Sequence, residues 1–245
     1  MERIQVDRIL DRLGGLLLPP RCMLCNDAGQ APCLDLCPGC EAALPREGGE
    51  AALPGAQVPS GLPAGLDRCH APFLYAAPVD QLVHALKYRG ALAAGRVLGM
   101  LLAADVAALG LHLDVDWVLP MPLHPSRHAA RGSNQSAEIA RWVARPLGRP
   151  SLPSALRRVR ATRPQVGLGI ADRRANVDGA FVAAADCTDR RIALVDDVVT
   201  TGSTLAAAAA ALRAAGAASV DAWCVARAAA PDRVHCLPDP ETETA

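Results

Sequence analysis

The segment Ile192-Ala193-Leu194-Val195-Asp196-Asp197-Val198-Val199-Thr200-Thr201-Gly202-Ser203-Thr204-Leu205 is the most informative stretch of the 245-residue sequence. Four apolar residues predict a buried strand, and two acids stand at its carboxyl end. A loop of hydroxyl residues and one glycine follows, and the loop leads into an alanine-rich helix. This order indicates an α/β protein that binds a ligand beyond the carboxyl ends of its strands.

Each part of this segment has a chemical use. Gly202 lets the backbone approach a ligand closely. The amides of residues 200–204 lie at a helix amino terminus, which favours an anion. Hydroxyl groups add donors for phosphate oxygens at Thr200, Thr201, Ser203 and Thr204. Asp196 and Asp197 are acceptors for sugar hydroxyls, so the segment predicts a ribose 5-phosphate site; the competing interpretation is an ordinary strand–turn–helix with capping residues.

The pattern outside this segment predicts alternating strands and helices from about residue 70. Strands are expected at 71–76, 115–119, 180–182, 191–195 and 220–225. Helices are expected from residue 79, at 91–110, at 133–147 with Ser133 as N-cap, and at 204–215. Such alternation is typical of a parallel sheet covered by helices on both faces.

A cysteine cluster precedes this region. Five of the nine cysteines lie between residues 22 and 40, and an odd, clustered set does not resemble a disulfide framework. Two Cys-x-x-Cys pairs, at 22/25 and 37/40, supply the four soft ligands that structural zinc requires. Cys33 competes as a ligand, and reduced thiols without metal are the alternative.

Composition and charge exclude several classes of protein. The 25 basic and 25 acidic residues give a net charge of zero, which argues against disorder and against a broadly basic nucleic-acid coat. No apolar stretch is long enough for a membrane span, and no targeting signal is convincing, so a cytoplasmic protein is expected. The expected domains are an amphipathic helix at 1–19, a zinc ribbon at 20–45, a linker at 46–66, an α/β domain at 67–238 and a disordered tail at 239–245.

The acid-and-loop segment resembles the phosphoribosyl diphosphate (PRPP) loop of type I phosphoribosyltransferases at every position. The resemblance implies that Asp196 and Asp197 hold the ribose 2- and 3-hydroxyls, and that residues 200–204 cradle the 5-phosphate. It implies the type I phosphoribosyltransferase fold, a parallel sheet flanked by helices, here with an N-terminal four-Cys zinc ribbon.

The combination of Cys-x-x-Cys pairs with such a domain resembles the ComF family, which is linked to competence and DNA uptake. The resemblance covers about residues 12–230 and rests on four further segments. These segments are Leu86-Lys87-Tyr88-Arg89-Gly90, Val118 to His124 with its Pro120-Met121-Pro122 turn, Arg131 to Gln135 with Ser133 in place of the family's Phe, and the mobile-loop region with Arg160, Thr162, Gln165, Arg173 and Asn176.

The resemblance implies roles for these residues. A diphosphate leaving group needs cations and Mg²⁺ as the C1–O bond breaks. The candidate counter-charges are Lys87, Arg89, Arg131, Arg160 and Arg173. Lys87 and Arg173 are further catalytic candidates, with Asp196 and Asp197, and Pro122 and Gln165 are further substrate-binding candidates. A loop at about 157–178 is expected to close over the substrate.

Two functions remain open at this point. One is Mg²⁺-dependent transfer of a phosphoribosyl group from PRPP to an unknown acceptor. The other is a non-catalytic role in DNA uptake or processing, in which the zinc module and the arginines between 157 and 174 contact single-stranded DNA or a helicase partner. Neutral net charge speaks against strong general affinity for nucleic acid.

Overall fold

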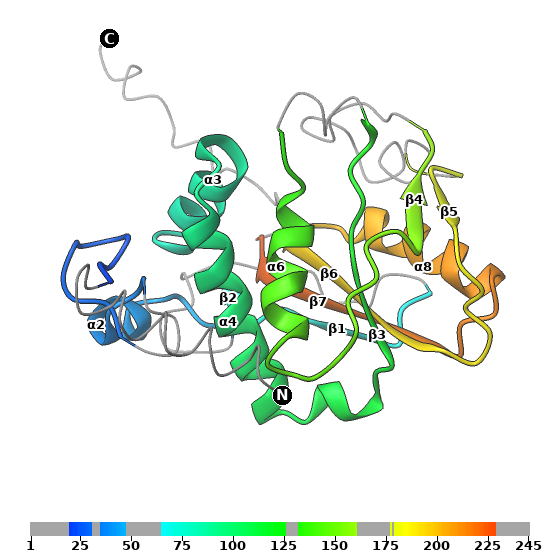
Figure 1. The fold of residues 1–245 in the computed structure, drawn as a ribbon, viewed down its shortest axis with the longest axis horizontal. Coiled ribbons are helices and arrows are strands. Elements are labelled where there is room, and N and C mark those ends of the chain that lie inside the picture. The colour runs from blue at the N-terminus through cyan, green and yellow to red at the C-terminus, as the bar shows by residue number, and fades with distance from the viewer. Residues whose placement is uncertain are drawn as a thin grey trace, which may run out of the picture.

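The centre of the molecule is a parallel sheet around two nine-residue strands, β6 (Arg191–Val199) and β7 (Ser219–Arg227) (Figure 1). The computed structural model describes residues 20–30, 35–47, 65–125, 132–160, 177 and 179–228. The predicted helix at 1–19, the tail at 239–245 and most of the predicted linker and mobile loop lie outside these residues.

Strand order places β6 and β7 between shorter neighbours. The order is β1-β7-β6-β3, and β2 pairs with the far end of β7 beyond β1. The neighbours are β1 (Arg68–His70), β2 (Phe73–Leu74) and β3 (Trp117–Pro120). Every pairing in this sheet is parallel, so all its strands end at the same edge.

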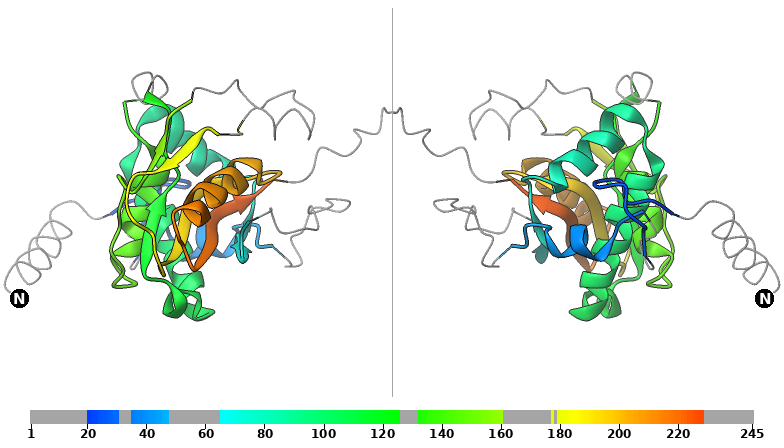
Figure 2. Two further views of the ribbon diagram at one scale, coloured as in Figure 1. Left: turned by 90° about the vertical axis from the view of Figure 1, so that its right-hand side faces the viewer. Right: turned by 90° about the vertical axis from the view of Figure 1, so that its left-hand side faces the viewer.

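Helices cover both faces, as the sequence predicts. α3 (Val79–Arg89), α4 (Leu92–Ala108) and α6 (Gln135–Ala144) share one core cluster with Ala193, Val195 and Trp223 of the sheet. α8 (Ser203–Ala214) covers the other face and shares a second cluster with Ile192, Leu194 and Ala222. Side chains of a strand alternate between its faces, which is why neighbouring residues of β6 enter different clusters. The two side views in Figure 2 show these layers.

Several predicted elements differ in detail. β6 continues through the two acids to Val199, because the long β7 offers partners as far as Arg227. α6 begins at Gln135 with Asn134 as N-cap, and not with Ser133, since the Asn134 side chain accepts the hydrogen bond from the Ser136 amide. A separate antiparallel pair is formed by β4 (Leu156–Arg158) and β5 (Phe181–Ala183), and the short 3-10 turn η1 spans Leu111–Asp114.

The cysteine-rich module packs against α3 and α4 (Figure 1). It contains one short helix, α2 (Pro38–Ala42), and its buried Leu36 and Leu44 belong to the same core cluster as those helices. Arg96 of α4 donates from Nε to the Asp35 carboxylate over 2.9 Å. The module and the α/β domain therefore share one hydrophobic core.

The segment that leaves the module is bonded to the edge of the sheet. Leu74 donates its amide to the Pro45 carbonyl over 2.8 Å, and the Glu47 amide donates to the Pro72 carbonyl over 2.9 Å. Arg227 of β7 donates from Nε to Glu47 over 2.8 Å. Residues 45–47 thus extend the sheet next to β2, where the sequence predicts the start of a linker.

Among the described helices, none combines the length and the apolar character that a membrane crossing requires.

Candidate functional site

The two adjacent acids lie near the carboxyl end of the sheet, in the second half of β6. Asp197 is buried, and Asp196 is half-buried. The Lys87 ammonium of α3 lies 3.0 Å from Asp197 Oδ2. That oxygen is buried and has no partner with hydrogen-bond geometry among the described residues, so its contact with Lys87 is an ion pair alone. An acceptor of this kind has capacity left for a ligand donor.

Ser136 of α6 fixes the orientation of Asp196. Its hydroxyl donates to Asp196 Oδ1 over 2.8 Å, and the Asp197 amide donates to the same oxygen over 3.0 Å. Burial, followed by the neighbouring charge of Asp197, raises the pKa of Asp196 to about 7. Asp196 is therefore protonated up to a higher pH than an ordinary carboxylate.

Lys87 is held in its charged form. Burial lowers the pKa of its ammonium, but the charge of the adjacent Asp197, followed by the charge of Asp196, outweighs burial and raises that pKa. The contact arises between α3 and β6, which are far apart in sequence. Lys87 contributes a fixed positive charge at the acid pair.

The loop after β6 is shaped as an anion cradle. Gly202 adopts φ +70°, the left-handed conformation that favours glycine, and it is the N-cap of α8. The Thr201 and Ser203 hydroxyl oxygens lie 2.9 Å apart, and the Ser203 amide donates to Thr201 over 3.5 Å. The amides of the first turn of a helix have no intrahelical acceptor, so this turn presents donors to a ligand.

A hollow joins the acids to this loop. Its volume is about 60 Å³, and it is lined by Asp196, Val198, Val199, Thr200, Gly202, Ser203, Thr204 and Leu205. That volume is far below the roughly 300–1,000 Å³ of cavities that enclose a whole organic ligand. It suits one small anionic group, with the rest of a ligand extending outward over the acids.

Of the other predicted site residues, the structure describes Pro122 and Arg89. Pro122 follows β3, and the Met121 amide donates to the Val195 carbonyl over 2.9 Å, so this turn lies at the level of the acids. Arg89 lines a second, larger cavity along α3. Arg131, Gln165 and Arg173 lie outside the described residues, so their predicted roles stay predictions.

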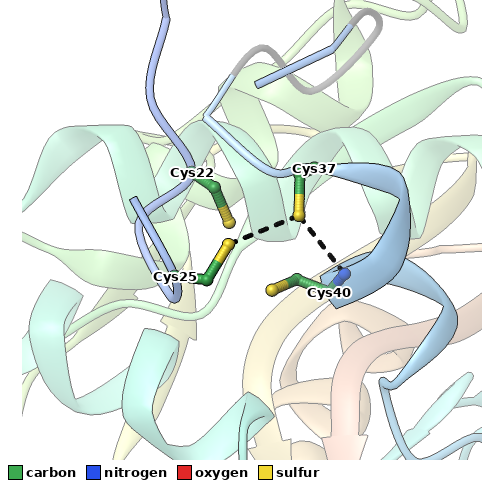
Figure 3. A group of neighbouring side chains, drawn as sticks. All are labelled: Cys22, Cys25, Cys37 and Cys40. Carbon is green, nitrogen blue, oxygen red and sulfur yellow. Dashed lines mark hydrogen bonds between the residues drawn. The ribbon is translucent and has the colours of Figure 1, made fainter. Parts of the chain in front are cut away.

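Four thiols converge in the N-terminal module (Figure 3). The Sγ atoms of Cys22, Cys25, Cys37 and Cys40 all lie within 4.8 Å of one another. Zn–S bonds of about 2.3 Å in a tetrahedron place the sulfurs about 3.8 Å apart, so this cluster fits a zinc ion with little adjustment. Cys33, the competing ligand, lies outside the described residues.

Hydrogen bonds around the thiols fit an anionic, metal-binding cluster. Burial raises the pKa of Cys22, but the amides of Cys25, Cys37 and Leu24 outweigh burial and lower that pKa to about 6. The Cys40 amide donates to Cys37 Sγ over 3.4 Å, which places Cys37 at the N-cap of α2. The hydrogen bond from Cys25, followed by burial, raises the pKa of Cys40, because neighbouring thiols without metal cannot all ionise together.

Two site residues carry no signal that single-sequence reasoning could use. Ser136 is the second residue of α6 and reaches Asp196 across sixty positions of sequence. Tyr75 follows β2 and belongs to the cavity along α3. Both are identified by sheet register and helix packing, which the local pattern does not contain.

Comparison with known proteins places this geometry in context. Residues 135–239 match the model of the phosphoribosyl transferase domain. Competence protein F of Haemophilus influenzae is 36% identical over 160 residues, which cover 63% of this chain and 70% of that protein. DNA utilization protein YhgH of Escherichia coli O157:H7 is 37% identical over 157 residues, which cover 62% and 69%.

Solved structures also match part of the chain. The glutamine PRPP amidotransferase of B. subtilis has a TM-score of 0.36 and 24% identity, and the match covers 52% of this chain and 25% of that chain. The purine phosphoribosyltransferase of Pyrococcus horikoshii has a TM-score of 0.36 and 18% identity, with coverage of 53% and 73%.

Proposed function

The chain belongs to the ComF family of phosphoribosyltransferase-like proteins, and from this premise we propose that it binds PRPP with Mg²⁺ and transfers the phosphoribosyl group to an acceptor. The observation that supports this most is the hollow that Asp196 shares with the loop residues Thr200, Gly202, Ser203 and Thr204. Acceptors for ribose hydroxyls and donors for a 5-phosphate are adjacent there, as one sugar-phosphate requires.

In this proposal each group of residues binds or orients a different part of PRPP. The loop and the first turn of α8 bind the 5-phosphate, while Asp196 and Asp197 accept hydrogen bonds from the ribose hydroxyls. Ser136 orients Asp196, and Lys87 adds positive charge beside the acids. When bound with PRPP, Mg²⁺ supplies charge that stabilises the departing diphosphate. Arg89, Arg131, Arg160 and Arg173 remain proposed counter-charges for that group.

Calorimetric titration with PRPP and Mg²⁺ tests this proposal. Wild-type protein is expected to bind, and the double variant Asp196→Asn/Asp197→Asn is expected to lose that binding. Asp189→Asn is a matched control, because Asp189 is exposed and its φ of +59° is one that Asn accommodates. A wild-type protein that does not bind PRPP contradicts the proposal.

We propose that the four-Cys cluster holds structural zinc. Four thiolates close a tetrahedral site and leave no position for a substrate, so the metal stabilises the module and does not catalyse. Metal analysis of purified protein is expected to give one zinc per chain. Absence of zinc, with four freely reactive thiols, contradicts this assignment.

The names of the relatives favour a place in competence or DNA use. Competence protein F and DNA utilization protein YhgH are connected with these processes by name, and we propose the same setting for this chain. Direct contact with single-stranded DNA or a helicase is the alternative to catalysis. A mobility shift with single-stranded DNA over a salt series tests direct contact, and no shift at low salt contradicts it.

A further inference from the structure

A closed set of hydrogen bonds, the Asn134 network, joins the turn after β3 to the acid pair. The Asn134 side chain donates from Nδ2 to the Met121 carbonyl over 3.1 Å and accepts the Ser136 amide on Oδ1 over 3.1 Å. Ser136 donates its hydroxyl to Asp196 Oδ1 over 2.8 Å. The Met121 amide closes the network, because it donates over 2.9 Å to the carbonyl of Val195, the residue before Asp196. One side-chain amide thereby connects two segments of the site that are far apart in sequence.

Capping of α6 alone does not require asparagine at position 134. Aspartate and serine cap helices about as well as asparagine, and a negative charge at a helix amino terminus is favourable. Only an amide carries an acceptor oxygen and a donor nitrogen at the tip of one short side chain. Asn134 uses the oxygen for the helix and the nitrogen for the Met121 carbonyl. The bond to Met121 is therefore a second role, which capping does not explain.

The Asn134 network lies against the sheet and is largely buried. Met121, Gln135 and Ser136 are exposed by only 4%, 7% and 1%. α6 packs against both β3 and β6 (Figure 1). Water has little access to groups in such a place, so each lost bond leaves a donor or acceptor unpaired. A change at Asn134 should therefore be transmitted to Ser136 and not be absorbed by solvent.

The network ends on the acid that is proposed to bind ribose. The Ser136 hydroxyl and the Asp197 amide both donate to Oδ1 of Asp196, so two bonds fix the plane of that carboxyl group. Neither bond uses Oδ2, which keeps acceptor capacity for a ligand. Burial, followed by the charge of Asp197, raises the pKa of Asp196, and the hydrogen bond from Ser136 opposes both. Loosening Ser136 should therefore raise the pKa of Asp196 further.

We propose that Asn134 is a positioning residue that holds Ser136 on Asp196 and couples the turn after β3 to recognition of the ribose hydroxyls. This inference rests on the proposed function. Asn134 acts through Ser136 and Asp196 and does not itself contact the ligand. The turn carries Pro122, a predicted substrate-binding residue, so the network sets that turn and the ribose-binding acid together. The loop for the 5-phosphate lies outside the network, and its affinity for phosphate should not depend on Asn134.

The first test needs no ligand. NMR of the full chain with isotope-labelled aspartate follows the titration of the Asp196 carboxyl group, and Asp196→Asn identifies its signal. Asn134→Ser keeps a good N-cap but loses the amide donor. The titration midpoint of Asp196 should rise by about half a pH unit or more in Asn134→Ser, and at least as far in Ser136→Ala. An unchanged midpoint in Asn134→Ser overturns the inference, whether or not the protein binds PRPP.

The second test measures recognition of the sugar. Calorimetry with Mg²⁺ compares ribose 5-phosphate with 2-deoxyribose 5-phosphate, and inorganic phosphate is the reference ligand. In Asn134→Ser the preference for the 2-hydroxyl should fall by about threefold or more, while the affinity for inorganic phosphate stays the same. In an Asp196→Asn background the same change should have no further effect, because Asn134 acts through that carboxylate. An equal loss of preference in both backgrounds overturns the inference.

Ser133→Ala is the matched control. Ser133 directly precedes the cap and belongs to none of the bonds of the network, so its loss should change neither the midpoint nor the preference. If Asn134→Ser lowers Tm and weakens all three ligands equally, Asn134 is a helix cap only, and the inference is overturned. If the midpoint rises as expected but wild-type protein binds no sugar phosphate, the proposed function fails and the role in ribose recognition fails with it, whereas control of Asp196 by Asn134 is supported.

Discussion

The β6–α8 segment and the cysteine-rich module differ in what holds their functional side chains in position. In β6–α8 the acids, the loop and the helix terminus are contiguous, and a strand held on both sides fixes their positions. In the module Cys22 and Cys25 lie on a short turn, while Cys37 and Cys40 lie at the start of the five-residue helix α2. The first region is positioned by the backbone hydrogen bonds of the sheet, whereas the second packs on α3 and α4 and, as we propose, depends on a bound zinc ion.

This difference predicts where each region is vulnerable. A change in the β6 acids should affect ligand binding while leaving the fold in place. A change in the thiols should affect the fold first, because metal-binding energy is folding energy in small metal modules. The changes below separate the two regions, in order of decreasing effect.

Cys40→Ser should have the largest effect on stability. Losing one of four ligands should release the metal and loosen the module, which shares the core cluster of α3 and α4. We expect Tm to fall by about 10 °C or more, since each kcal/mol shifts Tm by roughly 2–4 °C at this size. Cys69→Ser is the matched control, because Cys69 is a half-buried thiol outside the cluster. Equal Tm and equal zinc content in the two variants would refute the structural role.

The double variant Asp196→Asn/Asp197→Asn should have the largest effect on binding. Amides cannot supply four carboxylate acceptor oxygens beside Lys87, so we expect PRPP affinity to fall by about 100-fold or more, roughly 2.7 kcal/mol. Zinc content should stay at the wild-type level. Loss of zinc in this variant would show that the two regions are not separable.

Asp196→Asn alone should stabilise the protein at alkaline pH. The folded pKa of Asp196 is raised to about 7 from 3.8, so the folded state holds a proton that the unfolded chain has lost. Stability therefore falls as pH rises from about 4 to about 7. The variant removes this loss, and the free energy of unfolding at pH 8 should rise by about 2 kcal/mol. Denaturant titrations from pH 4 to pH 8 check this, and an unchanged slope would contradict it.

Lys87→Met should lower PRPP affinity by about tenfold, or 1.4 kcal/mol. The change leaves the charge of Asp197 buried without its ion pair, and it keeps most of the apolar stem of the side chain. Calorimetry provides the affinity, and Lys87→Arg should recover part of it. An affinity equal to wild type would mean that the pair has no part in binding.

Arg46→Gln should have the smallest effect. Arg46 lies 3.0 Å from Asp105, but its side chain is 51% exposed, and Asp105 also accepts a contact of 2.6 Å from His70. Exposed pairs contribute about 1 kcal/mol or less, so Tm should fall by at most a few degrees. A larger fall would show that docking of the module depends on this one contact.

The parts that the sequence predicts are the local ones. The acids, the loop and α8 follow one another along the chain, so strand and helix periodicity identify them directly. The two cysteine pairs carry their metal chemistry in their own spacing, and the structure confirms that all four thiols converge. The strand, the helix and the thiol cluster are predicted correctly because the residues that form each of them are neighbours in sequence.

The parts that escape prediction depend on distant partners. The end of β6 is set by the length of β7, and the orientation of Asp196 is set by Ser136. The cap of α6 falls on Asn134 because its side chain, and not that of Ser133, accepts the Ser136 amide. Residues 46 and 47 stand at the start of the predicted linker, and their backbone bonds beside β2 involve partners that the local sequence does not indicate.

The central claim is that the paired acids and the loop hold two ends of one ligand. Titration with ribose 5-phosphate, 2-deoxyribose 5-phosphate and inorganic phosphate, each at the same Mg²⁺ concentration, tests that claim most directly. The account predicts that ribose 5-phosphate binds most tightly, that loss of the 2-hydroxyl costs at least tenfold, and that inorganic phosphate binds most weakly. Equal affinity for all three would contradict it, since the acids would then contribute nothing to recognition of the sugar.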